Sequence, residues 1–432
     1  MKKITKVFAL LLSLVLLVPA VLAGCGSGGT DETTSGAGTD KTEIVIGYVA
    51  PFTGPLSMFT VNFDWVMEKS LEKINADGGI YIKAYDKKLP VRVIKADSES
   101  NATKASEVAS KLVLDDKVDI LTGSWTPETS TPVAAIAERY QVPCLISNSP
   151  ADSWLAGGPY TWSYGIMFYV EDMMTSYIDA LDKLGENNKK VGFLFDSEVD
   201  GVTFSAMLAK MLPERGYEVV DPGRFTMATT DYTNIITQLK SADCDIVIGN
   251  QILPNFTTAW GQFKQLGYVP KAMIIGKAIA YGSDVAALGE GMGEGLMTEN
   301  HWDRTLPFTS SLLGLTCEEI AAAWETEKGT QYPATSLGWD IALFEVLNET
   351  FTSCENLEPA TIRDAIAAVD YEGVYGKLSF DEKHIMAVPL STAQWTKSDK
   401  WQYEANIVAA GKFSGVTINT INPEFIPGYT VK

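Results

Sequence analysis

The segment Gly123-Ser124-Trp125-Thr126-Pro127 carries the residue types best suited to hold a charged ligand. An apolar, strand-like run ends at Thr122, Thr126 is a good helix N-cap, and Pro127 suits the first helical position. Such a loop presents unpaired backbone N–H groups, the positive end of a helix dipole and the Ser124 hydroxyl at the carboxyl edge of a parallel sheet. This is the chemistry of an anion or carboxylate receptor, although a capped helix that binds only water would show the same residues.

Patterns typical of enzymes are absent from the sequence. The two histidines, His301 and His384, have no partner at the spacing of a zinc site. Neither a G-x-S-x-G nucleophile motif nor a G-x-x-x-x-G-K-[ST] phosphate loop occurs. The glycine-rich stretch at 289–295 follows no clear strand and lacks the last glycine of a dinucleotide loop. We therefore expect a binding protein without catalytic residues, metal or cofactor.

The N-terminus has the pattern of an export signal. Three lysines precede an apolar run of about 16 residues, which is shorter than the roughly 20 residues of a membrane span. The run ends in Leu22-Ala23-Gly24-Cys25, which resembles the lipobox of bacterial lipoproteins. We expect residues 1–24 to be a signal peptide and Cys25 to carry lipid, so that the protein is extracytoplasmic and anchored to the bacterial membrane. A plain secretory signal cleaved nearby is the alternative.

Composition narrows the range of partners. The sequence has 34 Lys+Arg against 54 Asp+Glu, a formal net charge of −20. Nucleic acids and anionic membrane surfaces both require a basic footprint. We therefore expect no nucleic acid partner, and membrane contact through the lipid anchor only. Residues 25–42 are rich in Gly, Ser and Thr and predict a flexible tether.

Strand-like apolar runs alternate with helical patterns along most of the chain, which indicates parallel sheets with crossover helices. The chain is longer than the 250–300 residues or so that one core usually holds. We therefore predict an α/β fold with two doubly wound lobes. The expected strands are 43–49, 91–96, 118–123 and 142–147 in the first set, and 191–195, 217–225, 244–249 and 272–276 in the second.

Five stretches of the sequence form an ordered set: IGYVAPFTGPLS (46–57), EKINADGGI (72–80), ADSESNATKASEVASKLV (96–113), GSWTPETSTPVAAIAERYQVPCLISNSPA (123–151) and EGVYGKLSFDEK (372–383). Their order and spacing resemble the type I periplasmic binding proteins, in particular the leucine/isoleucine/valine-binding branch that feeds ABC importers. The resemblance implies two lobes joined by three crossing strands, with the ligand between them. It implies lobe 1 at 43–164 plus 299–373, lobe 2 at 165–298 plus 374–410, and a C-terminal tail at 411–432.

The resemblance also implies ligand-binding residues in both lobes. In lobe 1 the family holds the ligand carboxylate with the loop described above and with the next loop on the same edge. In lobe 2 the positions that hold an amino-acid ammonium are changed: Asp200 replaces a tyrosine before Gly201, and Asn255 replaces an acidic residue after Pro254. The expected ligand-binding residues are Ser124, Trp125, Thr126, Asn148, Ser149, Ala151, Tyr164, Asp200, Asn250, Gln251, Asn255, Lys277 and Trp302.

Aromatic residues crowd the expected cleft. We expect Trp125 and Tyr164 to face it and Trp302 to lie near the second crossing, whereas Trp154 and Phe168 are expected to be packing residues. Flat aromatic walls suit an aromatic or bulky apolar ligand. Because both ammonium positions are changed, two ligand classes stay open: a free amino acid and a carboxylic acid without an amine.

The resemblance implies a monomer that closes on its ligand by a hinge motion and delivers it to an ABC permease. A sensor of the same fold that signals to a membrane receptor is the alternative.

The cysteines leave one structural question open. Cys144 and Cys244 lie in apolar runs and are expected to be buried thiols. Cys317 and Cys354 flank a helical stretch, and an exported protein permits a disulfide between them. Spacing alone does not decide whether they are bridged.

Overall fold

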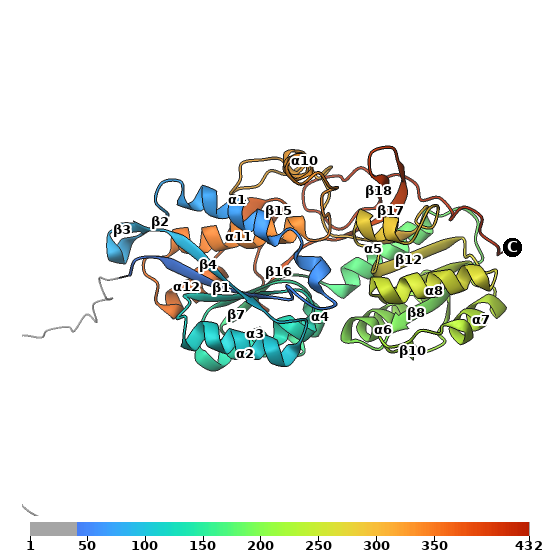
Figure 1. The fold of residues 1–432 in the computed structure, drawn as a ribbon, viewed down its shortest axis with the longest axis horizontal. Coiled ribbons are helices and arrows are strands. Elements are labelled where there is room, and N and C mark those ends of the chain that lie inside the picture. The colour runs from blue at the N-terminus through green and yellow to red at the C-terminus, as the bar shows by residue number, and fades with distance from the viewer. Residues whose placement is uncertain (1–40, 432) are drawn as a thin grey trace, which may run out of the picture. The chain divides into compact units, whose positions relative to one another are not determined.

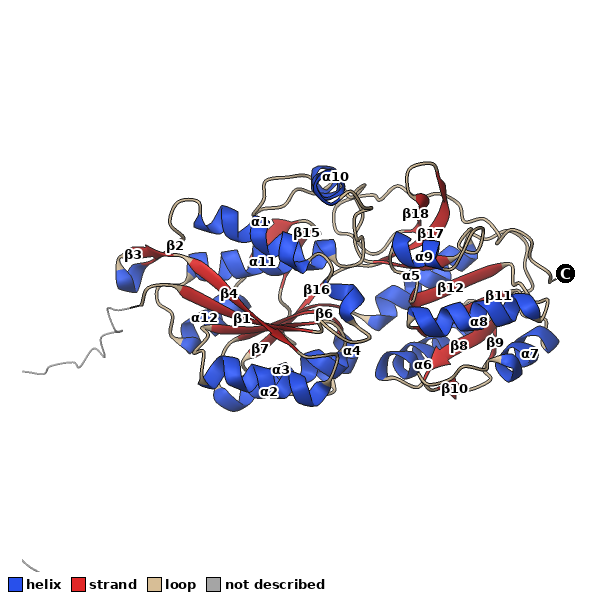
Figure 2. Ribbon diagram, viewed as in Figure 1, coloured by secondary structure: helices blue, strands red, loops and turns tan. Residues whose placement is uncertain are grey.

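The computed structural model describes residues 41–431, so the predicted signal peptide, the lipidation site at Cys25 and nearly all of the tether lie outside the described residues. Two large β-sheets organise the described part, and helices cover both faces of each (Figures 1 and 2). The prediction of an α/β fold with two doubly wound lobes is confirmed.

Lobe 1 is the first sheet with its helices. The sheet is parallel throughout, in the order β16-β7-β6-β5-β1-β4. All seven residues of its β1 are buried, as expected for a strand with both sides covered. The strands are β1 (Ile44–Ala50), β4 (Val91–Asp97), β5 (Ile120–Ser124), β6 (Cys144–Pro150), β7 (Ser163–Phe168) and β16 (Ile385–Ala387). Helices α2 (Ala102–Leu114), α3 (Pro127–Tyr140) and α4 (Ala151–Leu155) pack on one face, and α1 (Phe63–Asn75) and α11 (Leu337–Ser353) on the other (Figure 1).

Lobe 2 is the second sheet, in the order β10-β8-β11-β12-β13-β17-β18, with β9 paired to β8. Its last two strands run antiparallel to their neighbours. The strands are β8 (Lys190–Asp196), β9 (Glu218–Val220), β10 (Arg224–Phe225), β11 (Ile246–Gln251), β12 (Ala272–Lys277), β13 (Met297–Asn300), β17 (Ser391–Ser398) and β18 (Gln402–Ala409). Helices α5 (Val170–Asp182) and α6 (Val199–Glu214) cover one face, and α7 (Thr233–Ser241), α8 (Leu253–Gln265) and α9 (Gly282–Ala287) the other.

The sheet memberships move three of the predicted lobe boundaries. The boundary at 164/165 falls inside β7, which continues in lobe 1 to Phe168. The boundary at 298/299 falls inside β13, and the one at 373/374 precedes β16, which still belongs to the lobe 1 sheet. The reason is physical: a crossing segment is as apolar as the strand that it continues, so the sequence does not mark where one becomes the other.

Smaller elements complete the described part. They are helices α10 (Cys317–Lys328) and α12 (Pro359–Ala367), the 3-10 turns η1 (Ser57–Thr60) and η2 (Lys83–Tyr85), and the hairpins β2 (Ile80–Ile82)–β3 (Lys87–Leu89) and β14 (Asp370–Gly373)–β15 (Gly376–Ser379). The C-terminal tail packs back on lobe 2, where the Ile426 N–H donates to Lys271 O at 2.8 Å. The Gln394 side chain also bonds both backbone groups of Glu424.

The four cysteines of the described chain are free and buried, which corrects the suggested Cys317–Cys354 bridge. The Cys317 Sγ lies 3.7 Å from Val374 O, and the Val374 N–H meets Glu345 in the middle of α11. Cys354 follows the end of α11, about 13 Å further along the helix axis at 1.5 Å per residue. Cys317 therefore lies beside the middle of the helix and Cys354 beyond its end, whereas a disulfide needs Cα atoms within about 7 Å.

Thiol titration checks this correction. On protein that begins after Cys25, a thiol reagent in denaturant should count four free thiols. Burial raises the pKa of Cys244, Cys317 and Cys354 to about 12, so the native protein should react slowly at pH 8. Two free thiols in denaturant without reductant would instead indicate a disulfide between Cys317 and Cys354.

Candidate functional site

The loop after β5 has an unusual backbone. Trp125 and Thr126 both have positive φ, at 65° and 58°, a region that residues with side chains rarely enter. Such conformations cost of the order of 1–3 kcal/mol each and cluster at functional sites. The Trp125 N–H donates to Ser147 O at 3.3 Å, whereas the Thr126 N–H has no acceptor among the described residues. One backbone donor is therefore free at the start of α3.

The predicted capping of α3 is only half right. Thr126 occupies the N-cap position, but its hydroxyl makes no capping bond and lies 3.4 Å from the Thr129 hydroxyl. The backbone of Ser124 ends β5, and its side chain lies outside the described part of the structure.

Asn148 and Ser149, which were expected in the next loop, lie at the carboxyl end of β6, where its register is irregular between Ser147 and Pro150. For Asn148 the backbone and side chain are both unusual. Its φ is 53°, and its Nδ2 is buried with no acceptor within residues 41–431. Ser149 is fully buried 3.5 Å from the Ser130 hydroxyl, and Ala151 begins α4, also fully buried. Of these three predicted residues, Asn148 alone reaches the cavity described below.

An ion pair forms the lobe 2 side. Lys277, the last residue of β12, places its Nζ 2.5 Å from Oδ2 of Asp200 in the first turn of α6. The two side chains are 15% and 3% exposed. Burial by itself would lower the pKa of Lys277, but Asp200 and Glu128 raise it well above its usual value. Lys277 is therefore charged, and Asp200 Oδ1 stays buried without a donor in the described chain.

These groups meet in one cavity between the lobes, which we call the cleft cavity. Its volume is about 40 Å³, which is room for a few water molecules, so a larger ligand requires the two lobes to move apart. One apolar wall is the Phe59–Trp125 stack, with ring centroids 4.9 Å apart and planes at 11°. The lining residues are Phe59, Trp125, Thr126, Asn148, Pro150, Phe168, Met173, Asp200, Phe204, Asn250, Lys277, Glu299, His301 and Thr335.

Glu299 and His301 are lining residues that the sequence analysis missed. Glu299 Oε1 accepts the Lys277 N–H at 2.8 Å, and Oε2 accepts the Tyr177 hydroxyl at 2.7 Å. Burial raises the pKa of Glu299, and these bonds oppose the rise. His301 Nδ1 accepts the Trp339 indole N–H at 2.9 Å, which assigns the proton of the neutral ring to Nε2. Neither residue belongs to a recognisable motif.

His301 should stay neutral far below the usual range of histidine. Burial lowers its pKa to about 3, so its contribution to stability is present above pH 6.5 and is lost as pH falls toward 3, by the order of 4 kcal/mol. In the His384→Gln variant, His301 is the only histidine, and its imidazole proton shift should not titrate between pH 8 and pH 4.5. A midpoint near 6.5 in that NMR titration would contradict this assignment.

Several predicted residues lie away from the cleft cavity. Tyr164 packs on His384, with ring centroids 4.1 Å apart, because β7 ends four residues later and presents Phe168 at its carboxyl edge instead. Asn255 donates to Met227 O and to the Tyr232 hydroxyl and so braces a lobe 2 loop. Trp302 is fully buried against the Gly338 backbone. Gln251 is buried with both amide atoms unpartnered but is not a lining residue.

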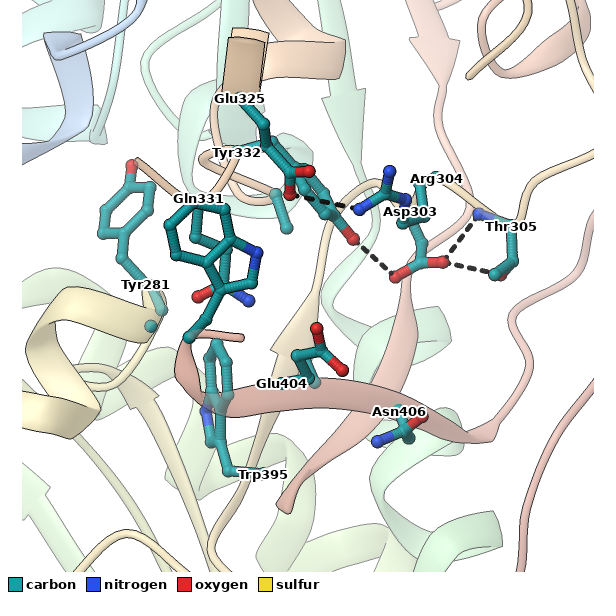
Figure 3. Close-up of a pocket in the computed structure, with 15 residues that line it drawn as sticks. Tyr281, Asp303, Arg304, Thr305, Glu325, Gln331, Tyr332, Trp395, Glu404 and Asn406 are labelled. Atoms are coloured by element: carbon teal, nitrogen blue, oxygen red, sulfur yellow. Dashed lines mark hydrogen bonds and ion pairs between the residues drawn. The ribbon is translucent and has the colours of Figure 1, made fainter. Parts of the chain in front are cut away.

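A second cavity, the hairpin cavity, lies where α10, the 303–305 segment and the β17–β18 hairpin meet (Figure 3). Its volume is about 220 Å³. Glu325 in its wall is held by Arg304 at 3.1 Å and by Lys400 at 2.8 Å. Arg304 covers the Tyr332 ring, and Lys400 covers the Trp401 ring. Most charged groups and aromatic rings of this cavity therefore already pair with one another. Few of them are left to bind a ligand, so we take the cleft cavity as the candidate site.

Within residues 41–431, no helix has the length and apolar character to cross a bilayer. No cluster of three or more His, Cys, Asp or Glu side chains there could hold a metal ion.

Comparison with known proteins agrees with this architecture. A family model described as periplasmic binding protein matches residues 43–400. Leu/Ile/Val-binding protein homolog 7 of Brucella abortus is 23% identical over 350 residues, covering 78% of this chain and 84% of that protein. The substrate-binding protein LivJ of Streptococcus pneumoniae, solved with isoleucine, aligns with a TM-score of 0.70 at 20% identity, over 85% of this chain and all of that one. A solute-binding protein of R. palustris, solved with 4-hydroxybenzoate, has a TM-score of 0.68 at 16% identity, over 87% and 99%.

Proposed function

The chain belongs to the periplasmic binding protein family, and we propose that it captures a small carboxylic acid in the cleft cavity and delivers it to the permease of an ABC importer. The protein works outside the cytoplasm. We further propose that lipid on Cys25 anchors it, on the evidence of the lipobox-like tetrapeptide, and that it is a monomer, as the family resemblance implies.

One observation carries the ligand-binding proposal: residues that line the cleft cavity in both lobes have buried polar atoms with no hydrogen-bond partner among the described residues. Lobe 1 brings Trp125 Nε1 and Asn148 Nδ2; lobe 2 brings Asp200 Oδ1 and both amide atoms of Asn250. An unsatisfied buried polar group costs about 1–3 kcal/mol. A bound molecule that pairs these atoms therefore stabilises the arrangement in which both lobes face it.

A carboxylate suits the lobe 1 side. The free Thr126 N–H, the Asn148 amide and the N-terminal end of α3 are donors or positive dipole ends. The ligands of the two solved relatives, isoleucine and 4-hydroxybenzoate, each carry a carboxylate. We propose that the acid docks on lobe 1 first and that lobe 2 then closes over it by hinge motion, which excludes water and strengthens the polar contacts.

Calorimetric titration with a panel of small acids tests the proposal. The panel holds leucine, isoleucine, benzoate, 4-hydroxybenzoate and short aliphatic acids. At least one acid should bind, and Asn250→Ala, which removes a lobe 2 partner, should weaken it at least tenfold. Asn406→Ala in the hairpin cavity is the matched control and should leave the affinity unchanged. No binding by any acid, or an affinity that follows Asn406 instead, would contradict the proposal.

A further inference from the structure

We propose that the lobe 2 end of the cleft cavity recognises an uncharged hydrogen-bond donor on the ligand, so that the ligand is a hydroxylated carboxylic acid with an apolar body rather than a free amino acid. The inference rests on the proposed function and narrows its ligand class.

Asp200 is the group that requires a donor. One carboxylate oxygen is taken by Lys277 at 2.5 Å, and the other, Oδ1, is buried without a donor in the described part of the chain. Asn250, which lines the same wall, has a buried amide with neither atom paired. A ligand hydroxyl can donate to Asp200 Oδ1 and accept from the Asn250 amide at the same time. Two orphaned groups are then satisfied by one ligand atom.

The charge of Asp200 is already balanced. The Lys277 ammonium is its counter-ion, so a ligand ammonium beside Asp200 would be desolvated close to a like charge. The other carboxylate on the wall, Glu299, has both oxygens bonded, by the Lys277 N–H and by the Tyr177 hydroxyl. Asp196 and Glu128 also act on Lys277, but neither lines the cavity. Each carboxylate that lines the cavity in the described chain therefore already has a partner within the protein. None of them is free to pair with a ligand amine alone.

The walls between the two ends are apolar. Phe59 and Trp125 stack in lobe 1, and Phe168 and Phe204 also line the cavity. A flat or branched hydrocarbon body fits between aromatic faces, while the carboxylate meets Thr126 and the hydroxyl meets Asp200.

The test uses acids that share one carbon skeleton. Titrations with phenylalanine, 3-phenyllactate, 3-(4-hydroxyphenyl)propionate and 3-phenylpropionate compare an ammonium, a hydroxyl at either of two positions, and no donor. Leucine, 2-hydroxyisocaproate and 4-methylpentanoate repeat the comparison on a smaller skeleton. A hydroxylated acid should bind at least tenfold more tightly than both the amino acid and the plain acid of its series. Tighter binding of an amino acid, or equal binding of the plain acid, would overturn the inference and leave the proposed function standing. If every acid failed, the proposed function would fall with it.

A charge variant tests the part played by the ion pair. Lys277→Met leaves Asp200 without a counter-ion, so the ratio of amino-acid to hydroxy-acid affinity should rise at least tenfold. Lys277→Arg keeps the charge and should keep the wild-type order of the acids even if each binds more weakly. An unchanged ratio in a folded Lys277→Met protein would refute the role of the pair, and if that variant does not fold, the wild-type series still decides.

Discussion

Replacing Asp200 with alanine should lower the free energy of unfolding by about 3 kcal/mol, because it leaves the buried Lys277 ammonium without its partner. Removing one member of a buried pair costs more than the pair contributes, since the remaining charge stays out of water. Asp196 and Glu128 still attract Lys277. The expected loss of stability therefore lies at the lower end of the roughly 3–5 kcal/mol that breaking a buried ion pair costs. Urea denaturation followed by far-ultraviolet circular dichroism measures it.

The double variant Asp200→Ala/Lys277→Met is the control. It removes both charges, and replacing a buried ion pair by apolar groups is often nearly neutral, so most of the lost stability should return. If the double variant were as unstable as the single one, the loss would come from packing around α6 and not from the stranded charge.

Trp125→Ala should weaken binding of the ligand at least 100-fold, equivalent to about 2.7 kcal/mol. The substitution removes the stacking partner of Phe59 and one of the unpaired donors of the cleft cavity. Calorimetric titration with the best acid of the panel provides the measurement.

Trp154→Ala is the matched control for that variant. Trp154 is fully buried in the same lobe and stacks on Tyr160 with ring centroids 3.9 Å apart, but it does not line the cleft cavity. Both variants should cost about 3–5 kcal/mol of stability, and only Trp125→Ala should cost affinity. Equal losses of affinity would mean that binding responds to the stability of lobe 1 and not to contact with Trp125.

The lobe 1 half of the candidate site could be predicted from local rules. The carboxyl ends of parallel strands meet at one edge, so the loop after β5 and the end of β6 had to lie close together, and Trp125, Thr126 and Asn148 are found there. The same rule misplaced Tyr164. An apolar strand can continue for several more residues without any change of residue type, so the sequence did not show where β7 ends. The structure puts Phe168, predicted as packing, at that edge instead.

The lobe 2 half depends on contacts between distant segments. Asp200 and Lys277 were each expected in the site, but nothing local predicts that they pair with each other and so alter what the ligand must supply. Glu299 and His301 enter from the second crossing, where the sequence carries no periodic pattern, and His301 owes its neutral form to burial against Trp339. Such contacts between distant segments can be recognised only in the three-dimensional structure.

A crystal structure of the protein with the best-binding acid would show directly where the ligand is held. We expect the ligand in the cleft cavity, with its carboxylate at the Thr126 amide and Asn148 and a polar group of its other end at Asp200 and Asn250. A ligand seated in the hairpin cavity beside Glu325 and Glu404, with the cleft cavity empty, would contradict it.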